Sequence, residues 1–464
     1  MQERLIKQRK GQHLTSQKAC HYRYQLGGGK QMKAKSLLKS GFLLLLALFL
    51  MVGCSNTGSS GDGNGKTVEL TMQAWGNPAE LKVYQKAIDG FMKENPNIKV
   101  KLVPVASDQY DQKLMTSLQG SKGPDVFYAH EPTMPQMIEA DVIQPLDDFF
   151  ASEESYVELS EFPEGLFGPA RQDGKTYGVA PDANPMVIYY NKTVFKEAGL
   201  KTPQEYYDEG NWNWDTFLEV TSKIKESGKE GLVMENWWGH WYSWIWSNGG
   251  RIFDEEGNLV LPENDKAKEA FHFLYDLVAN GNAVYAGSLP QGQGVDAMFM
   301  SNQVGMVAGG RWFTPQFDQS GNLDYDYIYF PSNTEKKQEM VGIPVAYLSV
   351  NKKSKHVEEA MKFVSYYVSK AGQEVRTGVG GNALPSLPLA DENAIGDDSD
   401  KHMEYLFDGR DNGFTHGSNL ARDAQFAGLT TEITETIDLM FLGKQDADTT
   451  IDKVAETINK YINK

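Results

Sequence analysis

The residues from about 67 onward carry the hydrophobic patterns of alternating strands and helices. Residues 67–75 and 98–105 alternate between apolar and polar side chains, which is typical of half-buried strands. Residues 124–129 form a short apolar run, and segments of helical periodicity separate these three strands. The alternation of strand and helix predicts a parallel sheet with helices on its faces. The helices predicted in this part span residues 81–95, 110–118 and 134–139.

A second α/β region is expected to begin with a strand at residues 186–191 and to continue to about residue 341. Residues 341–350 then have the pattern of another strand, 357–369 that of an amphipathic helix, and 429–463 are mostly helical. We find no internal repeat, and no membrane segment after the apolar run at residues 42–52. Because ligands of open α/β sheets bind beyond the carboxyl ends of the strands, the loops after Trp75 and Tyr128 are expected at one rim of a binding site.

Residues 32–53 have the features of a signal peptide. Three lysines at positions 33, 35 and 39 precede an unbroken apolar run, 42–52, which is too short to span a bilayer. The sequence Leu-Met-Val-Gly-Cys at 50–54 resembles a bacterial lipobox. The resemblance implies that Cys54 receives a diacylglycerol lipid and becomes the first residue of the mature protein.

The segments before and after the predicted signal peptide, residues 1–31 and 54–66, also have distinctive compositions. Residues 1–31 place a polar, basic stretch before it, so we interpret them as a mis-assigned extension and Met32 as the true start. The run Gly27-Gly28-Gly29 supports this interpretation, because glycine codons just upstream of a start codon resemble a ribosome-binding site. Residues 54–66 follow as the lipidated Cys54 and a Gly/Ser-rich tether, which has no apolar residue to bury and is expected to be flexible.

The chain length, the net charge and the number of cysteines exclude several classes of function. The 464 residues are enough for two lobes, and the net charge is −17. Residues 1–53 hold ten Lys or Arg and one acid, so the remainder has 35 basic and 61 acidic side chains, a net charge of −26. Such a body is not expected to bind nucleic acid or anionic lipid, which leaves the lipid on Cys54 as the only membrane attachment. Because Cys20 and Cys54 are the only cysteines, we expect no disulfide framework and no cysteine-based metal site.

Several short motifs occur in order along the chain, and they are weak singly but specific together. They are GPDV at 123–126, VIQPLD at 142–147, GVAP at 178–181, MVIYYNK at 186–192, FKEAGL at 195–200, WDTF at 214–217, GMVAGGRW at 305–312, VGI at 341–343 and a terminal helix at 452–462. This order and spacing resemble the extracellular solute-binding protein family that includes the maltose-binding protein.

The resemblance implies a periplasmic-binding-protein-like α/β fold, in which two α/β lobes enclose a ligand cleft and are joined by three crossings of the chain. Lobe 1 would comprise residues 67–180 and 344–392, and lobe 2 residues 181–343 and 393–464. The crossings would fall near 179–182, 341–347 and 389–393. The implied function is the capture of a mono- or oligosaccharide by closure of the lobes and its delivery to the permease of an ABC importer.

A sugar presents hydroxyl groups and an apolar C–H face, so its site needs aromatic platforms together with carboxylates, amides or arginines. Five of the nine tryptophans fall within residues 237–246. Aromatic stripes are usually core, and we expect one or two of Trp237, Trp238 and Trp241 to line the cleft. Trp312 matches the position at which the family stacks a tryptophan on sugar.

Seven further residues are predicted to contact the solute. Trp75 ends the first predicted strand, where the alternative is an aromatic that caps the lobe. Tyr128 and Glu131 lie in a segment that resembles the ligand-contacting strand end of the family, with His130 as a supporting neighbour. Asp182 and Asn184 lie at the first crossing, where the alternative is turn chemistry before Pro185. The last two are Arg311 beside Trp312, for which the alternative is an ion pair, and Tyr347 after the second crossing.

No catalytic motif supports an enzyme. The sequence has no nucleophile elbow, phosphate loop or zinc-ligand spacing, and no recognisable pair of catalytic carboxylates. We therefore expect a monomeric binding protein without cofactor or metal, lipid-anchored on the outer face of the cell membrane of a Gram-positive-type bacterium. Two alternatives remain open. One is a non-sugar solute such as a polyamine, bound by aromatic residues and acids, and the other is a sugar-sensing lipoprotein that signals rather than transports.

Overall fold

The structure is a computed structural model that describes residues 67–290, 293–336, 338–394, 401–416 and 422–463. The predicted signal peptide, the lipidation site Cys54 and the tether lie outside the described residues. Within the described part, the strands form two main sheets and one short hairpin, β4 (Arg171–Gln172) with β5 (Lys175–Thr176). None of the helices in that part has the length and apolar character needed to cross a membrane.

The first sheet has the strand order β11-β3-β1-β2. β1 (Val68–Ala74) is parallel to β2 (Ile98–Pro104) and to β3 (Val126–His130), as the sequence pattern predicts. β11 (Ala346–Val350) is antiparallel to β3. The strand expected over 341–350 is therefore wrong in its first half. There the backbone leads toward the other sheet, and the carbonyl of Gly342 accepts a hydrogen bond from the amide of Met186.

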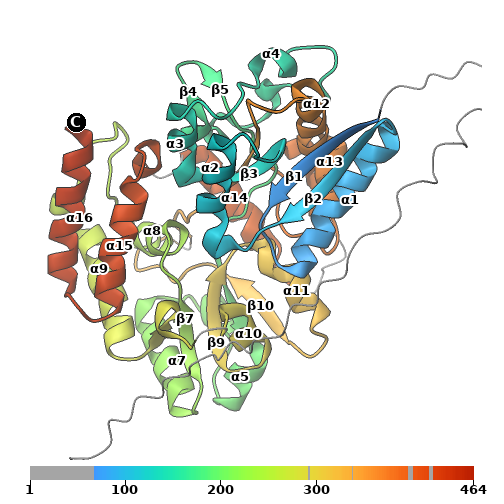
Figure 1. Cartoon of the computed structure of the whole chain (residues 1–464). Coiled ribbons are helices and arrows are strands. Elements are labelled where there is room, and N and C mark those ends of the chain that lie inside the picture. The colour runs from blue at the N-terminus through green and yellow to red at the C-terminus, as the bar shows by residue number, and fades with distance from the viewer. Residues whose placement is uncertain (1–66, 291–292, 337, 395–400, 417–421, 464) are drawn as a thin grey trace, which may run out of the picture. The chain divides into compact units, whose positions relative to one another are not determined.

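Helix α1 (Pro78–Glu94) begins three residues before its predicted start, because Asn77 caps it. The Asn77 side chain accepts hydrogen bonds from the amides of Ala79 and Glu80, and Pro78 occupies the first helical position, where its missing N–H costs nothing. Helices α12 and α13 pack against α1 beside this sheet (Figure 1). The other helices of this lobe are α2 (Tyr110–Gln119), α3 (Met134–Glu139) and α4 (Asp147–Phe150), while α12 spans Val357–Val368 and α13 Lys370–Thr377.

The second sheet has the order β10-β6-β9-β7-β8. β6 is antiparallel to β9 and β10, whereas β7 is parallel to β9 and β8. This sheet is therefore mixed, and its strands come from segments that are far apart in the chain. They are β6 (Val187–Asn191), β7 (Glu230–Met234), β8 (Ala283–Tyr285), β9 (Val304–Gly309) and β10 (Tyr325–Ile328).

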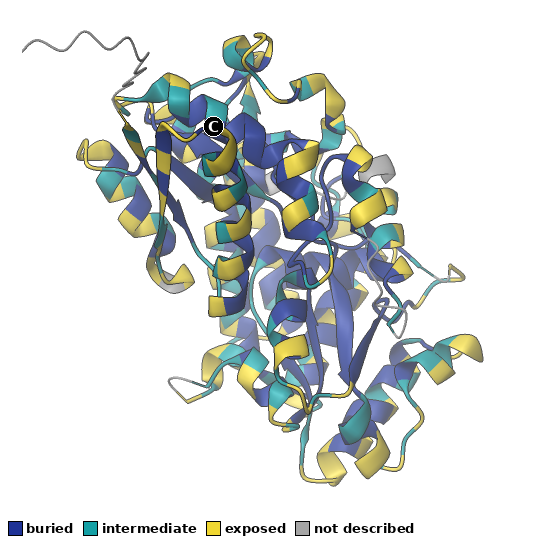
Figure 2. Ribbon diagram, turned by 90° about the vertical axis from the view of Figure 1, so that its right-hand side faces the viewer, coloured by how far each residue is buried: buried dark blue, intermediate teal, exposed yellow. Residues whose placement is uncertain are grey.

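Helices cover the second sheet, and their outward faces are the exposed surface (Figure 2). The segment predicted as mostly helical at the end of the chain is two helices, α15 (Leu429–Phe441) and α16 (Ala447–Ile462), which pack on each other and on α9. The turn between them contains Gly443 at φ +66°, a left-handed conformation that favours glycine. The other helices here are α5 (Lys192–Glu197), α6 (Pro203–Asp208), α7 (Trp214–Glu226), α8 (Trp238–Ser247), α9 (Asp265–Ala279), α10 (Val295–Met300), α11 (Thr314–Gln319) and α14 (Glu404–His416).

Each sheet has its own hydrophobic core, so the protein has two lobes. The core around the first sheet draws its residues from 70 to 183 and from 343 to 387, and two further clusters, one of which includes Leu384, form the core around the second sheet. Backbone hydrogen bonds join the segments that pass between the lobes. Ala183 and Leu384 exchange a pair of them, with N···O distances of 2.9 and 3.0 Å. We refer to residues 181–184, which overlap the first crossing predicted near 179–182, as the first crossing below.

Candidate functional site

Trp75 follows β1 directly and lies beside the end of β3, as the parallel sheet predicts. Its indole stacks on the imidazole of His130, with ring centroids 3.8 Å apart and an interplanar angle of 20°. The rings of Tyr110 and Tyr128 also contact the indole, with centroids 4.8 and 5.4 Å from it. The Nδ1 atom of His130 lies 2.8 Å from a carboxylate oxygen of Asp111, which fixes the ring. Trp75 itself is half-buried, so part of its indole is accessible at the rim of lobe 1.

The other predicted residues of lobe 1 are buried against the core. The hydroxyl of Tyr128 lies 3.0 Å from that of Tyr367. Glu131 Oε2 accepts a hydrogen bond of 3.3 Å from the amide of Val345. Tyr347 is fully buried, and burial together with the nearby charge of Glu131 raises its pKa well above 10. The structure thus places Tyr128, Glu131 and Tyr347 behind the rim, and their contact with a solute stays a prediction.

Trp237 and Trp312 come together in lobe 2. Their ring centroids are 6.1 Å apart, and both side chains are half-buried. Trp237 is the residue before α8, and Trp312 lies in a short 3-10 helix, η8 (Arg311–Phe313), that follows β9. Trp238 and Trp241 point into the core with exposed fractions of 7% and 1%. Of the three candidates in the tryptophan-rich segment, Trp237 alone therefore has substantial accessible surface.

Asp182, Asn184 and Arg311 form a connected polar group. The side-chain amide of Asn184 donates to Asp182 at 3.4 Å, and its Oδ1 accepts from the backbone amide of Arg311 at 3.1 Å. The Arg311 guanidinium donates to the carbonyls of Thr377 and Ala383, at 2.5 and 2.8 Å. All three predicted residues are buried, and hydrogen bonds within the protein occupy them.

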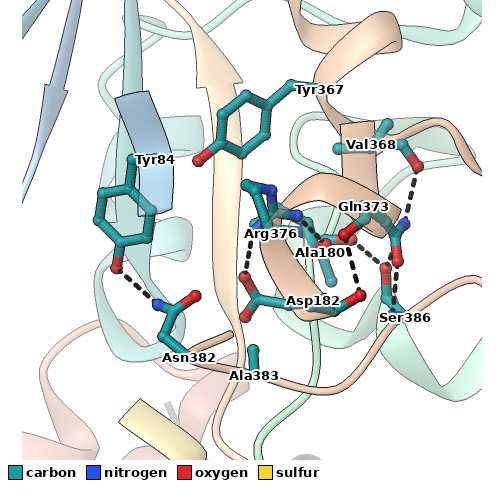
Figure 3. A network of polar contacts seen from close by, with 12 residues as sticks. Tyr84, Ala180, Asp182, Tyr367, Val368, Gln373, Arg376, Asn382, Ala383 and Ser386 are labelled. Carbon is teal, nitrogen blue, oxygen red and sulfur yellow. Dashed lines mark hydrogen bonds and ion pairs between the residues drawn. The ribbon is translucent and has the colours of Figure 1, made fainter. Parts of the chain in front are cut away.

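The carboxylate of Asp182 faces a buried arginine of α13 (Figure 3). Asp182 Oδ2 lies 2.7 Å from Nη1 of Arg376, whose guanidinium also stacks on the Tyr367 ring, 4.4 Å from its centroid. Burial raises the pKa of Asp182, and the charge of Arg376 opposes that shift. An ion pair this far from water persists because each charge has a close partner.

A second buried carboxylate, Glu80, lies at the start of α1. Its Oε2 accepts from the amide of Asn77 at 2.9 Å, whereas Oε1 has only long contacts of 3.5 Å to Tyr84 and Asn382. Burial raises the pKa of Glu80 to about 7, although the hydrogen bond from Asn77 acts in the opposite direction. The group is therefore poised to titrate close to neutral pH.

Sequence reasoning missed Glu80, Arg376 and Asn382 as members of this network. The Asn77-Pro78-Ala79-Glu80 segment has the pattern of a capping box, so Glu80 had a detectable local signal. Arg376 and Asn382 had none, because their partners Asp182 and Glu80 are 194 and 302 residues away in the sequence. Only the packing of α13 and its following loop on α1 and the first crossing brings them together.

The accessible side chains among the predicted site residues are aromatic. Trp75, Trp237 and Trp312 are each half-buried, and each lies just after a strand or just before a helix. Indole faces held in this way can bind the apolar face of a ring-shaped solute. Most of the predicted polar residues are buried and already hydrogen-bonded within the protein, namely Tyr128, Glu131, Asp182, Asn184 and Arg311.

Two surface hollows lie away from these residues. One, of about 610 Å³, is lined by α4, the β4–β5 hairpin and the start of α12, and the other, of about 280 Å³, lies between α11 and β10. Neither contains a predicted site residue. In the described ranges no group of three or more His, Cys, Asp or Glu is arranged to hold a metal ion.

Two α/β lobes joined by several crossings define the class of periplasmic-binding-protein-like folds. The structure of an ABC substrate-binding protein from Listeria monocytogenes, in complex with cycloalternan, has this fold. It matches with a TM-score of 0.73 and 21% identity, over 86% of this chain and 100% of that one. The model of the bacterial extracellular solute-binding protein family matches residues 75–374. The chain belongs to this family, whose members are solute-binding proteins of the extracytoplasmic side.

Relatives in other bacteria match along most of the chain. A binding protein of Brucella abortus is 25% identical over 400 residues, which is 82% of this chain and 90% of that protein. The multiple sugar-binding protein of Streptococcus mutans is 26% identical over 365 residues, 75% of this chain and 82% of the relative.

Proposed function

We propose that this protein is the carbohydrate-binding subunit of an ABC importer. It captures a mono- or oligosaccharide between its lobes and delivers it to a membrane permease. The observation that carries the proposal is the set of half-buried tryptophans, Trp75 in lobe 1 and Trp237 and Trp312 in lobe 2, at the ends of core elements in a chain of this family. The sugar-binding relative of Streptococcus mutans supports it.

The finer parts of the proposal concern attachment and assembly. We infer that Cys54 carries the lipid, that residues 55–66 tether the acidic body to the outer face of the membrane, and that the protein acts as a monomer without catalytic activity. Preferential binding of solute to the closed arrangement of the lobes drives closure, and the closed form then docks on the permease.

Calorimetry and thermal unfolding of the purified protein against sugars, polyamines and amino acids test the proposal. We expect a mono- or oligosaccharide to bind and to raise the unfolding temperature, because a ligand that binds only the folded state stabilises it. Trp312→Ala should weaken binding at least about tenfold, or roughly 1.4 kcal/mol, since it removes an aromatic platform.

Phe149→Ala is the matched control, because Phe149 is a half-buried aromatic of α4 on the outer surface of lobe 1. It should leave sugar affinity unchanged. If a polyamine binds and no sugar does, the proposal of a carbohydrate solute is wrong. Loss of sugar uptake on deletion of the gene would separate an importer subunit from a sugar sensor, whose deletion should leave uptake intact.

A further inference from the structure

Arg311 is a buried cation that donates hydrogen bonds across the junction of the lobes. It follows β9 in lobe 2, and its exposed fraction is 1%. Its guanidinium donates to the carbonyls of Thr377, Gly378 and Ala383, which belong to the end of α13 and the loop that follows it. Helix α13 packs on α1 and α12 in lobe 1. These hydrogen bonds therefore join the two lobes directly.

The end of α13 is a suitable place for this charge. The last carbonyls of a helix have no partners within the helix and carry the negative end of its dipole. Arg311 supplies donors to two of these groups, Thr377 and Gly378. A buried guanidinium is costly unless hydrogen bonds surround it, so this geometry fixes the position of the Arg311 head group.

The backbone of Arg311 is held from a second side. Its amide donates to Asn184 Oδ1 in the first crossing, and Asn184 in turn donates to Asp182. Asp182 pairs with Arg376, which lies in the last turn of α13 beside the carbonyl that Arg311 contacts. These contacts close a ring that passes from lobe 2 through the first crossing to α13 and back to Arg311.

Trp312, the next residue, packs against this closed set of polar contacts. A Cβ atom added to Gly310 would clash with the Trp312 indole and would lie 2.8 Å from Cβ of Asn184. The indole thus covers Gly310 at the point where Asn184 holds the backbone of Arg311. Through its neighbour Arg311, Trp312 is linked to the end of α13 in lobe 1.

We propose that Arg311 is a positioning residue, which holds the Trp312 platform in place by binding the end of α13 through its guanidinium and the first crossing through its amide. This inference rests on the proposed function for its effect on affinity, and it assigns Arg311 no contact with the solute. It accounts for a buried arginine whose donors are already directed at backbone carbonyls.

A double-mutant cycle tests this role. The four proteins are the wild type, Arg311→Lys, Trp312→Ala and the double variant. Lysine keeps the charge, but its donors all lie on one nitrogen and cannot reproduce the planar fork of the guanidinium. Arg311→Lys alone should therefore weaken carbohydrate binding about three- to tenfold. In the Trp312→Ala background it should change the affinity less than about twofold, because the group that it positions is gone. Losses that multiply would mean direct solute contact and would overturn the inference, as would an unchanged affinity of Arg311→Lys.

A second measurement needs no solute. The near-ultraviolet circular dichroism of the unliganded protein reports the surroundings of its tryptophans, and the spectral change caused by Arg311→Lys should vanish in the Trp312→Ala background. A change that persists there would contradict the inference. If the wild type binds no carbohydrate, the proposed function fails, and this spectral test still decides the role of Arg311.

Arg251→Lys is the matched control for the cycle. Arg251 also donates to a backbone carbonyl, that of Gly250, at 2.7 Å, but this carbonyl lies within lobe 2. The substitution should leave both the affinity and the spectral difference assigned to Trp312 unchanged. Thermal unfolding of every variant checks that it folds. At Arg311, lysine is preferred to alanine because alanine would leave the carbonyls of Thr377 and Ala383 without their donor.

Discussion

Glu80 shows how burial alters a single residue. In the unfolded chain its carboxyl has an ordinary pKa near 4.5, whereas in the folded protein burial raises the pKa to about 7. The folded state therefore binds the proton more tightly than the unfolded state. The resulting contribution to stability is complete below about pH 4.5 and is lost as the pH rises through about 7.

Glu80→Gln should flatten the pH dependence of stability between about pH 5 and 8. Glutamine can still accept the hydrogen bond from the Asn77 amide, because a capping box takes Glu or Gln, but it never has to be buried as an anion. Urea unfolding at several pH values would measure the effect. We expect the wild type to lose stability over this range more steeply than the variant, and parallel curves would contradict the assignment.

Glu205→Gln is a matched control with the opposite sign. Glu205 holds the same capping-box position in α6, but it is exposed, and the hydrogen bonds from the Thr202 amide and hydroxyl lower its pKa. Its stabilising effect is present at neutral pH and is lost as the pH falls through its lowered value. The substitution should therefore change stability under acidic conditions less than at neutral pH, and leave the slope between pH 5 and 8 unchanged.

At the scale of elements, the turn from β9 into η8 positions the accessible aromatic side chain of lobe 2. Gly309 ends β9, and Gly310 precedes η8. Gly310 has φ −95°, so a larger residue could adopt its backbone conformation. What requires glycine there is space, because the Trp312 indole and the Asn184 side chain both lie against it.

Gly310→Ala should therefore move the Trp312 indole. We expect a fall in solute affinity and a loss of roughly 1–3 kcal/mol of folding stability, as is typical of an added methyl group in a packed site. Calorimetry and denaturant unfolding would measure the two effects. Gly120→Ala, at the end of α2 with φ −76°, is the control, because its Cβ would meet no side chain, only the carbonyls of Thr116 at 3.2 Å and Ser117 at 3.8 Å. Full affinity in Gly310→Ala would show that the indole tolerates the displacement.

At the scale of the whole molecule, each lobe is built from separate parts of the chain. β11 returns to the sheet of lobe 1 beside β3, more than 200 residues later in the sequence, after the chain has completed the second sheet. In the proposed closure of the lobes, crossings gathered in one region would restrict the relative movement to a hinge. Ala183, Gly342 and Leu384 make backbone hydrogen bonds in this region.

The acidic body also bears on attachment of the whole protein. With a net charge of −26 outside residues 1–53, it should not adhere to an anionic membrane by itself. Cys54→Ala should therefore abolish labelling by radioactive palmitate and release the protein from the membrane fraction. Cys20→Ala should change neither result, because Cys20 lies upstream of the predicted start at Met32. Membrane retention and labelling of the Cys54 variant would refute lipidation at this position.

Local sequence patterns were enough to locate several elements and to indicate the family. Alternation located β1 and β2, an apolar run located β3, and ordered motifs along the chain indicated two lobes of the solute-binding class. It also placed Trp75 at the end of the first predicted strand and Trp312 a few residues beyond a later one. These features depend on periodicity, capping and short-range spacing, which neighbouring residues carry.

Packing between distant segments sets which of the predicted side chains remain accessible and which are already hydrogen-bonded within the protein. Trp238 and Trp241 are core, while Trp237 next to them is half-exposed, because α8 begins only after Trp237. Asp182 and Arg311 are directed at partners in α13 and the loop after it. A periodic pattern fixes the face of an element but not the segment that packs against it. The partner of a buried charge is therefore set by contacts between parts of the chain that are far apart in sequence.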